Sequence, residues 1–167
     1  TFNGGALSFT NTSAATYGGS VAVGVNGGTI NATGNQLNYL NNRVTFTGQL
    51  SGGGLVLNAD PASSRGLIVL NGAPGTQSVE SLTVMHGLVR IGDGSTATDL
   101  AVRDLIVQGT ASFNVGSGAV LKVGGGIAIA PTTSFSLDGE LDVATSASIG
   151  TAVAMNRLAT VSVAAGQ

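Results

Sequence analysis

The stretch that decides the fold is LKVGGGIAIAPTTSFSLDGELDV, which runs from Leu121 to Val143. It contains four triplets in which a small or polar residue stands between two large apolar residues. These triplets are Leu121–Val123, Ile127–Ile129, Phe135–Leu137 and Leu141–Val143. Alternation with a period of two residues is typical of a β-strand that buries one face. Because Gly-rich or Ser/Thr-rich gaps separate the triplets, the stretch predicts very short strands joined by tight corners.

The second half of this stretch repeats the first half when Phe135 is laid over Leu121. In this alignment Ile127 matches Leu141, and residue 125 matches residue 139, both glycines. Residues 105–109 resemble residues 121–125 more loosely, and the spacing varies elsewhere, so the repeat is degenerate. One such unit buries too little apolar surface to offset its ordering entropy, and the units must therefore stack.

Similar triplets recur from end to end of the chain. They are Leu7–Phe9, Val21–Val23, Leu37–Tyr39, Val44–Phe46, Leu55–Leu57, Leu67–Val69, Leu82–Val84, Val89–Ile91, Leu105–Val107, Phe113–Val115 and Val161–Val163. Helical periodicity is nearly absent, and the two best candidates, residues 78–82 and 97–104, are interpreted as strand or turn. We therefore expect an all-β fold: a parallel β-helix, or β-solenoid, of short strands with Gly/Asn-rich corners, forming one domain over residues 1–167.

The alternative fold is an antiparallel β-sandwich. Asp138-Gly139 stands between two triplets, and Asp-Gly suits the type I′ turn of a β-hairpin. The triplets count against this alternative, since the strands of a sandwich usually have five residues or more.

The composition excludes several classes of partner. Charged residues make up 8% of the chain, and the formal net charge is −2, with no cluster of Lys and Arg for a nucleic acid to bind. No apolar run approaches the roughly 20 residues that span a membrane as a helix, so membrane insertion is not expected. Cys is absent, which excludes disulfides, thiolate nucleophiles and Cys-ligated zinc.

Both ends of the sequence lie within the triplet pattern, and neither shows the polar capping unit that a solenoid needs against association through its open edges. The sequence therefore predicts a segment of a longer repeat protein, or a subunit that associates with itself end to end.

Two phrases, LSGGGLVLNADPASSRGLIVLNGAPG at residues 50–75 and the stretch at residues 121–143, resemble the β-strand repeats of autotransporter passenger domains and related bacterial surface adhesins. The likeness lies in Gly-rich turns followed by Leu/Val triplets. It implies a right-handed parallel β-helix that is exported and displayed on the outer surface of a bacterial cell. Because that family includes adhesins, self-associating proteins, proteases and esterases, the resemblance alone does not select a function.

Three carboxylates, Asp138, Glu140 and Asp142, form the first candidate site. Such a cluster could bind Ca²⁺ or supply the acid and base of glycoside hydrolysis. The opposing interpretation is a polar turn followed by outward strand positions, and we favour it because a turn within the cluster separates the side chains.

Residues 92–99, GDGSTATD, form the second candidate, because Asp93, Ser95 and Asp99 faintly resemble the ligands of a Ca²⁺ loop. The fixed ligand spacing and the bidentate acid of such loops are missing, so a solvent-exposed loop is the favoured interpretation. We predict no metal ligand, no cofactor and no catalytic residue.

The remaining motifs favour structural roles. His86 is the only His and has no G-x-S-x-G nucleophile motif to serve, and the glycine runs at 52–54 and 124–126 lack the Lys-Ser/Thr that phosphate binding requires. Thr45, Thr47, Thr96 and Thr98 form Thr-x-Thr pairs without the fixed period of an ice-binding face. Asn11 and Asn31 match the N-glycosylation pattern, which means little in a bacterial protein.

These observations favour a non-enzymatic, extracellular structural or adhesive module that stacks or self-associates. The alternatives are a β-helical polysaccharide-active enzyme, which would place one of the three carboxylates in a groove, and a glycan-binding surface formed by loops at 58–66 and 71–78.

Overall fold

The chain folds into parallel β-strands stacked as a β-solenoid. The computed structural model describes residues 1–10, 13–32, 43–58, 66–144, 148–149, 153–155 and 160–163. Within these ranges the regular structure is all strand, with no helix, and every strand pair is parallel. The expected fold class is confirmed.

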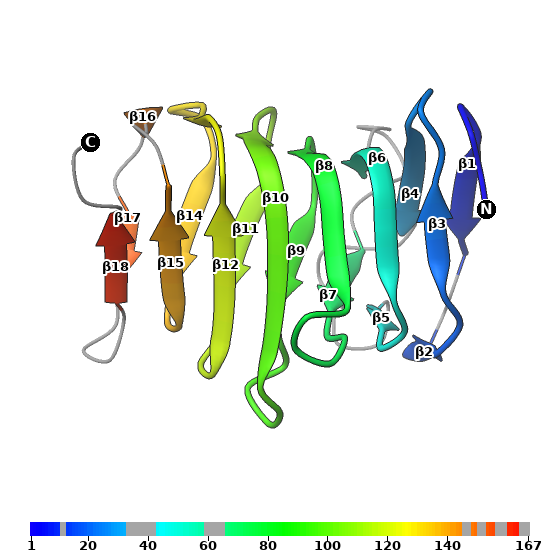
Figure 1. Cartoon of the computed structure of the whole chain (residues 1–167), viewed down its shortest axis with the longest axis horizontal. Helices are drawn as coiled ribbons and strands as arrows, with labels where there is room; N and C mark the ends of the chain where they lie inside the picture. Colours follow the sequence, from blue (N-terminus) through cyan, green and yellow to red (C-terminus); the bar gives the residue numbers. More distant parts are fainter. Residues whose placement is uncertain are drawn as a thin grey trace.

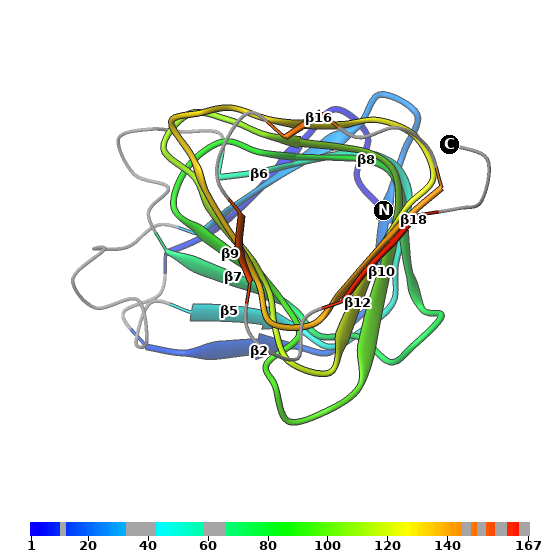
Figure 2. The same cartoon turned by 90° about the vertical axis from the view of Figure 1, so that its left-hand side faces the viewer.

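The solenoid has three faces, and the chain visits them in the same order in each coil. Figure 1 shows the strands side by side along the axis, and Figure 2, viewed along the axis, shows a roughly triangular outline. A sheet of 11 strands forms faces 1 and 2, because its longest strands bend around the corner between them, and a sheet of seven strands forms face 3.

The strands are assigned to the faces by their pairing. Face 1 consists of β3 (Val21–Val23), the first halves of β6 (Leu50–Leu57), β8 (Gln77–Val84) and β10 (Thr98–Val107), and of β12 (Ala119–Val123), β15 (Glu140–Val143) and β18 (Thr160–Val163). Face 2 consists of β1 (Ala6–Phe9), β4 (Gly28–Ala32), the second halves of β6, β8 and β10, β13 (Ile127–Ile129) and β16 (Ser148–Ile149). Face 3 consists of β2 (Ala15–Tyr17), β5 (Arg43–Phe46), β7 (Leu67–Leu70), β9 (Leu88–Ile91), β11 (Ser112–Val115), β14 (Ser134–Leu137) and β17 (Val153–Met155).

The sandwich alternative is wrong. Strands β14 and β15, which a hairpin at Asp138-Gly139 would pair, belong to different sheets. Strand β14 pairs with β11 and β17, and β15 pairs with β12 and β18. Asp138-Gly139 is therefore a corner between face 3 and face 1.

The repeat that aligns Leu121 with Phe135 does not describe one coil of the solenoid. Leu121 pairs with Leu141 in the next coil, whereas Phe135 lies on face 3 and pairs with Phe113. The repeat therefore relates each strand to the strand two faces further along the chain, β12 to β14 and β13 to β15. It matched the two positions because all three faces share the same alternation of apolar and polar residues.

Stacking aligns identical positions of successive coils into inward-facing columns. On face 1 one column contains Val23, residue 52 (a glycine), and then Val79, Val102, Val123, Val143 and Val163. On face 3 Phe113 stacks on Phe135, with ring centroids 5.7 Å apart. A buried aliphatic or aromatic side chain contributes about 1.5–3 kcal/mol each, so these columns are the main stabilising element.

The triplet Leu67–Val69 has its inward positions one residue later than predicted. In the register of face 3, Ile68 pairs with Val44 and Leu70 with Phe46, so Ile68 and Leu70 face the core. All four residues of β7 are buried, and a fully apolar strand carries no alternation from which its inward face can be read. The triplet Leu37–Tyr39 lies outside the described residues.

Three strands are longer than the expected triplets because they continue around a corner. In β6 the bend between faces 1 and 2 occurs at Gly52-Gly53. Gly52 has φ = +110°, and a Cβ there would collide with the carbonyl oxygen of Val23 in the preceding coil. Glycine is therefore required at this position both by the backbone angle and by the close approach of two coils.

We predict that Gly52→Ala lowers the free energy of unfolding by about 2 kcal/mol or more, because it adds both backbone strain and a clash with the neighbouring coil. Chemical denaturation followed by circular dichroism measures the change.

Gly75→Ala is the matched control, since Gly75 also has positive φ (78°) but no atom within 4 Å of the added Cβ. The control should lose only the strain term, about 1 kcal/mol. Equal losses in the two variants would show that contact between coils at Gly52 is unimportant.

Candidate functional site: the charged face 1

Most charged side chains of the described chain lie on face 1 or at its border with face 2. They are Glu80, Asp99, Arg103, Asp104, Lys122, Glu140 and Asp142. By contrast, the outward column at the centre of face 2 holds Thr29, Val56, Thr83, Ile106 and Ala128, none of which is charged. Face 1 therefore carries most of the charged groups that could bind a ligand.

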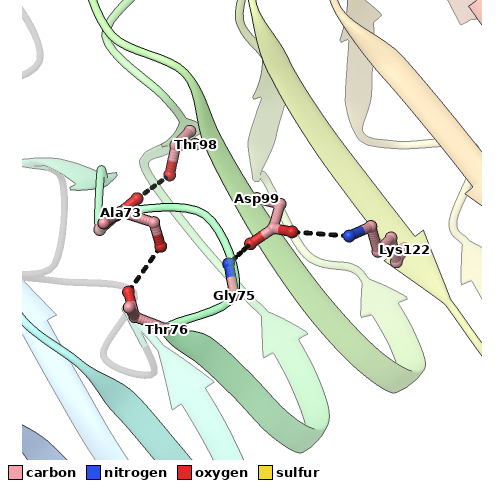
Figure 3. A network of polar contacts seen from close by, with 7 residues as sticks. Ala73, Gly75, Thr76, Thr98, Asp99 and Lys122 are labelled. Atoms are coloured by element: carbon pink, nitrogen blue, oxygen red, sulfur yellow. Dashed lines mark hydrogen bonds and ion pairs between the residues drawn. The ribbon is translucent and has the colours of Figure 1, made fainter.

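An ion pair links three successive coils at the side of face 1 next to face 3. Asp99, at the start of β10, accepts a hydrogen bond from Lys122 Nζ on β12 at 2.6 Å and another from the Gly75 amide at 2.6 Å. Figure 3 shows the Asp99 carboxylate between these two donors. The neighbouring Thr98 donates its hydroxyl to the carbonyl oxygen of Gly72. The turn before β8 is thereby fixed against β10.

Asp99 and Lys122 each stabilise the charged form of the other. Burial opposes ionisation of Asp99, but the hydrogen bonds from Lys122 and Gly75, together with the charge of Lys122, leave the pKa of this carboxyl below its usual value. The hydrogen bond and charge of Asp99 raise the pKa of the Lys122 ammonium, and the charges of Asp142 and Glu140 add to this effect.

A second charged network follows the corner between faces 1 and 2. Arg103 Nη1 lies 2.9 Å from Glu80 Oε1, and Arg103 Nε lies 2.8 Å from Asp104 Oδ2. Asp104 also accepts a hydrogen bond from the Gly126 amide at 2.9 Å. Like the Asp99 pair, this network connects groups from three successive coils.

Between the two networks lies an open trough of about 620 Å³. Its floor is a column of small outward residues, Ser51, Ser78 and Ala101, which pair in register across β6, β8 and β10. Lys122 on β12 is the next residue of this column, and its ammonium reaches back to Asp99 at the border with face 3. Glu80, Arg103 and Lys122 belong to its lining. The trough exists because short side chains on the floor lie between long charged side chains at the borders.

The three candidate carboxylates do not converge on one point. Asp138 lies at the corner before β15 and accepts a hydrogen bond from Asn114 Nδ2 at 3.2 Å. Glu140 and Asp142 lie on the outward side of β15, where Glu140 accepts a hydrogen bond from the Ser162 hydroxyl at 3.5 Å. Asp138 and Glu140 line a shallow depression of about 250 Å³ that does not include Asp142.

The residues of the candidate Ca²⁺ loop do not converge on a common point either. Asp93 accepts hydrogen bonds from the amide and hydroxyl of Ser95, at 2.9 and 2.6 Å, and so closes its own turn. Asp99 is directed to Gly75 and Lys122 instead. Among the described residues no group of three His, Cys, Asp or Glu side chains could hold a metal ion.

The other candidate motifs lie at corners or in the wall of the solenoid. His86 Nδ1 lies 3.1 Å from the Thr110 hydroxyl of the next coil. Thr45 and Thr98 are buried, so the Thr-x-Thr pairs form no exposed row. Asn31 lies in β4, partly buried, whereas Asn11 lies outside the described residues.

Of the two predicted loops, the first is described only at its two ends, and the second is shorter than expected. Asn58 is fully buried, and its side-chain oxygen accepts a hydrogen bond from the Ala32 amide at 2.9 Å. Residues 59–65 lie outside the described part of the chain. The second predicted loop is a short turn that ends at Thr76, because Gln77 and Ser78 already belong to β8.

The charged networks were missed in the sequence because their members come from successive coils and are far apart in the chain. The signal that could have revealed them is the coil length, which places Glu80 beside Arg103 and Asp99 beside Lys122.

The described ranges include no helix of the length and hydropathy needed to cross a membrane. No protein-family model, curated protein or solved structure gives a significant match to the chain.

We predict that Asp99→Asn lowers the free energy of unfolding by about 1 kcal/mol at neutral pH, because it removes a charge-assisted hydrogen bond. Because the pKa of Asp99 is lower in the folded state than the unfolded value of 3.8, the ionised carboxylate stabilises the fold above pH 3.8. This contribution is lost as the pH falls below 3.8 and the carboxylate becomes protonated. The difference between variant and wild type should therefore shrink below about pH 3.8 in denaturation curves recorded from neutral to acid pH.

Asp142→Asn is the control, since Asp142 pairs with Lys122 in the register, whereas the ion pair of Lys122 is with Asp99. This variant should change stability by less than about 0.5 kcal/mol. A loss for Asp99→Asn that is the same at acid and neutral pH would contradict a charge effect.

Proposed function

We propose that the chain is a structural β-solenoid module of a bacterial cell surface, which builds a stalk, adhesin or filament by adding further coils to its open end. The proposal assigns no catalytic role to the chain. Its partner is a second copy of the same chain, or further coils of the same kind.

One observation carries this proposal: the inward positions of the last described strand are exposed, whereas those of the preceding strand of face 1 are buried. Val161 and Val163 on β18 continue the inward columns of face 1, but their side chains are 47% and 57% exposed. In the preceding strand Leu141 and Val143, at the same positions, are each 2% exposed. One more coil in register would cover both valines, which favours stacking.

The N-terminal coil offers a matching apolar surface. Phe2, Leu7 and Phe9 are partly buried and pack against the core, and Phe9 contacts Tyr17 and Phe46 edge-on within one aromatic cluster. Since successive strands are parallel, an added copy would have to join its first coil to the last coil of its neighbour. Such a head-to-tail contact, repeated along the solenoid axis, lengthens the rod into a filament and does not close a ring.

Electrostatics does not oppose this contact. Residues 1–59 contain one charged side chain, Arg43, so the first coils present almost no charge to a neighbouring copy. Carboxylates are concentrated on the outward side of face 1, away from the core columns. Like-charge repulsion between the two ends is therefore weak.

The composition supports an extracellular location. The chain carries few charges and no Cys, and its polar surface relies on Gly, Asn, Ser and Thr. This composition, with the repeat style shared with autotransporter passengers, is typical of exported bacterial surface proteins.

We expect the wild-type chain to form elongated end-to-end assemblies as its concentration rises, and Val161→Lys to prevent them, because a charge would then lie in the contact. Sedimentation velocity and negative-stain electron microscopy of the two proteins measure assembly length.

Ser162→Lys is the matched control: it adds the same charge to the same strand but on the outward side, next to Glu140. Assembly should survive this change. Short, monodisperse rods of wild-type protein at every concentration would contradict stacking between copies.

A further inference from the structure

The trough on face 1 has the form of a binding site for an extended ligand. Its floor, formed by Ser51, Ser78 and Ala101, runs across adjacent strands and so along the solenoid axis. The floor spans β6, β8 and β10, roughly 10 Å at about 4.8 Å per strand spacing, and Lys122 on β12 closes its end. A linear molecule would lie along this floor, crossing the strands.

The borders of the trough present hydrogen-bonding groups held in position by their own partners. The side chains of Arg103 and Lys122 are 62% and 49% exposed, yet each is fixed by a carboxylate, Glu80 or Asp104 for Arg103 and Asp99 for Lys122. The Ser51 and Ser78 hydroxyls add groups that can both donate and accept. A ligand thus meets donors and acceptors on both sides of the floor without a large ordering cost.

The balance of charge selects the chemical class of the ligand. Both cations of the lining are already paired, Arg103 with Glu80 and Asp104 and Lys122 with Asp99, so a polyanion would have to compete with these carboxylates for them. A hydroxyl group both donates and accepts, and it can therefore bridge a paired cation and carboxylate without separating them. An extended peptide is disfavoured because β8 and β10 are paired on both edges and have no free backbone groups for strand addition.

We propose that this trough binds a linear neutral oligosaccharide along the solenoid axis, with Ser78 on the floor and Arg103 and Lys122 at the two sides. Among the described residues no aromatic side chain lines the trough, so stacking against sugar rings does not contribute and the binding of one site is weak. Repetition of the site in a stacked assembly would raise the avidity, but the site itself does not depend on stacking.

The test is a nuclear magnetic resonance titration of the ¹⁵N-labelled chain with neutral hexasaccharides of β-1,4-glucan, α-1,4-glucan and β-1,4-mannan at millimolar concentration. We expect at least one of them to shift the backbone amide signals of Ser51, Ser78, Ala101 and Lys122. Ser78→Trp fills the floor and should weaken binding by about tenfold or more.

Thr83→Trp is the matched control, because Thr83 faces outward on the same strand but on face 2. It should leave binding unchanged, and circular dichroism verifies that both variants are folded. If Ser78→Trp does not fold, Arg103→Met removes a border group instead. The proposal is overturned if no neutral hexasaccharide shifts these amides, if the shifts map to another face, or if hexagalacturonate, an acidic counterpart, binds more tightly.

Discussion

Parallel, in-register pairing between coils is the constraint on which the rest of the structure depends. Because each strand lies directly over its equivalent in the preceding coil, an inward residue such as Val102 contacts the inward residues of its neighbours, Val79 and Val123. The same rule places outward residues in columns. The core, the two charged networks and the trough are all consequences of this one pairing rule, and a shift by one residue would move every core side chain outward.

The apolar columns were largely predictable, because most triplets have large residues at both inward positions. The prediction of which side chains face the core failed at β7. Its residues Leu67, Ile68, Val69 and Leu70 are all apolar, so their orientation depends on pairing with β5 and β9. It also overlooked Leu50–Gly52 and Gln77–Val79 on face 1. There a glycine and a buried glutamine occupy inward positions, and a pattern based on large apolar residues does not detect them.

The polar features of face 1 were not predictable from local sequence. The carboxylates singled out in the sequence, Asp138, Glu140 and Asp142, are close in the chain but do not line one depression together. Asp99 and Lys122 are far apart in the chain, yet they form the shortest ion pair of the described residues. In a solenoid, neighbours in space are one coil apart in sequence. Here the coil length is not constant. Paired positions are further apart in the sequence between β6 and β8 than between β12 and β15.

The proposed function follows from the same pairing rule. The inward column is exposed at β18, and this favours the stacking of one more coil in register. Amide hydrogen exchange of residues 160–163, measured over a range of protein concentrations, tests this most directly. Stacking between copies predicts that protection of these amides rises with concentration, while amides in β10 stay equally protected throughout. Protection of residues 160–163 that does not change with concentration would contradict stacking through this edge.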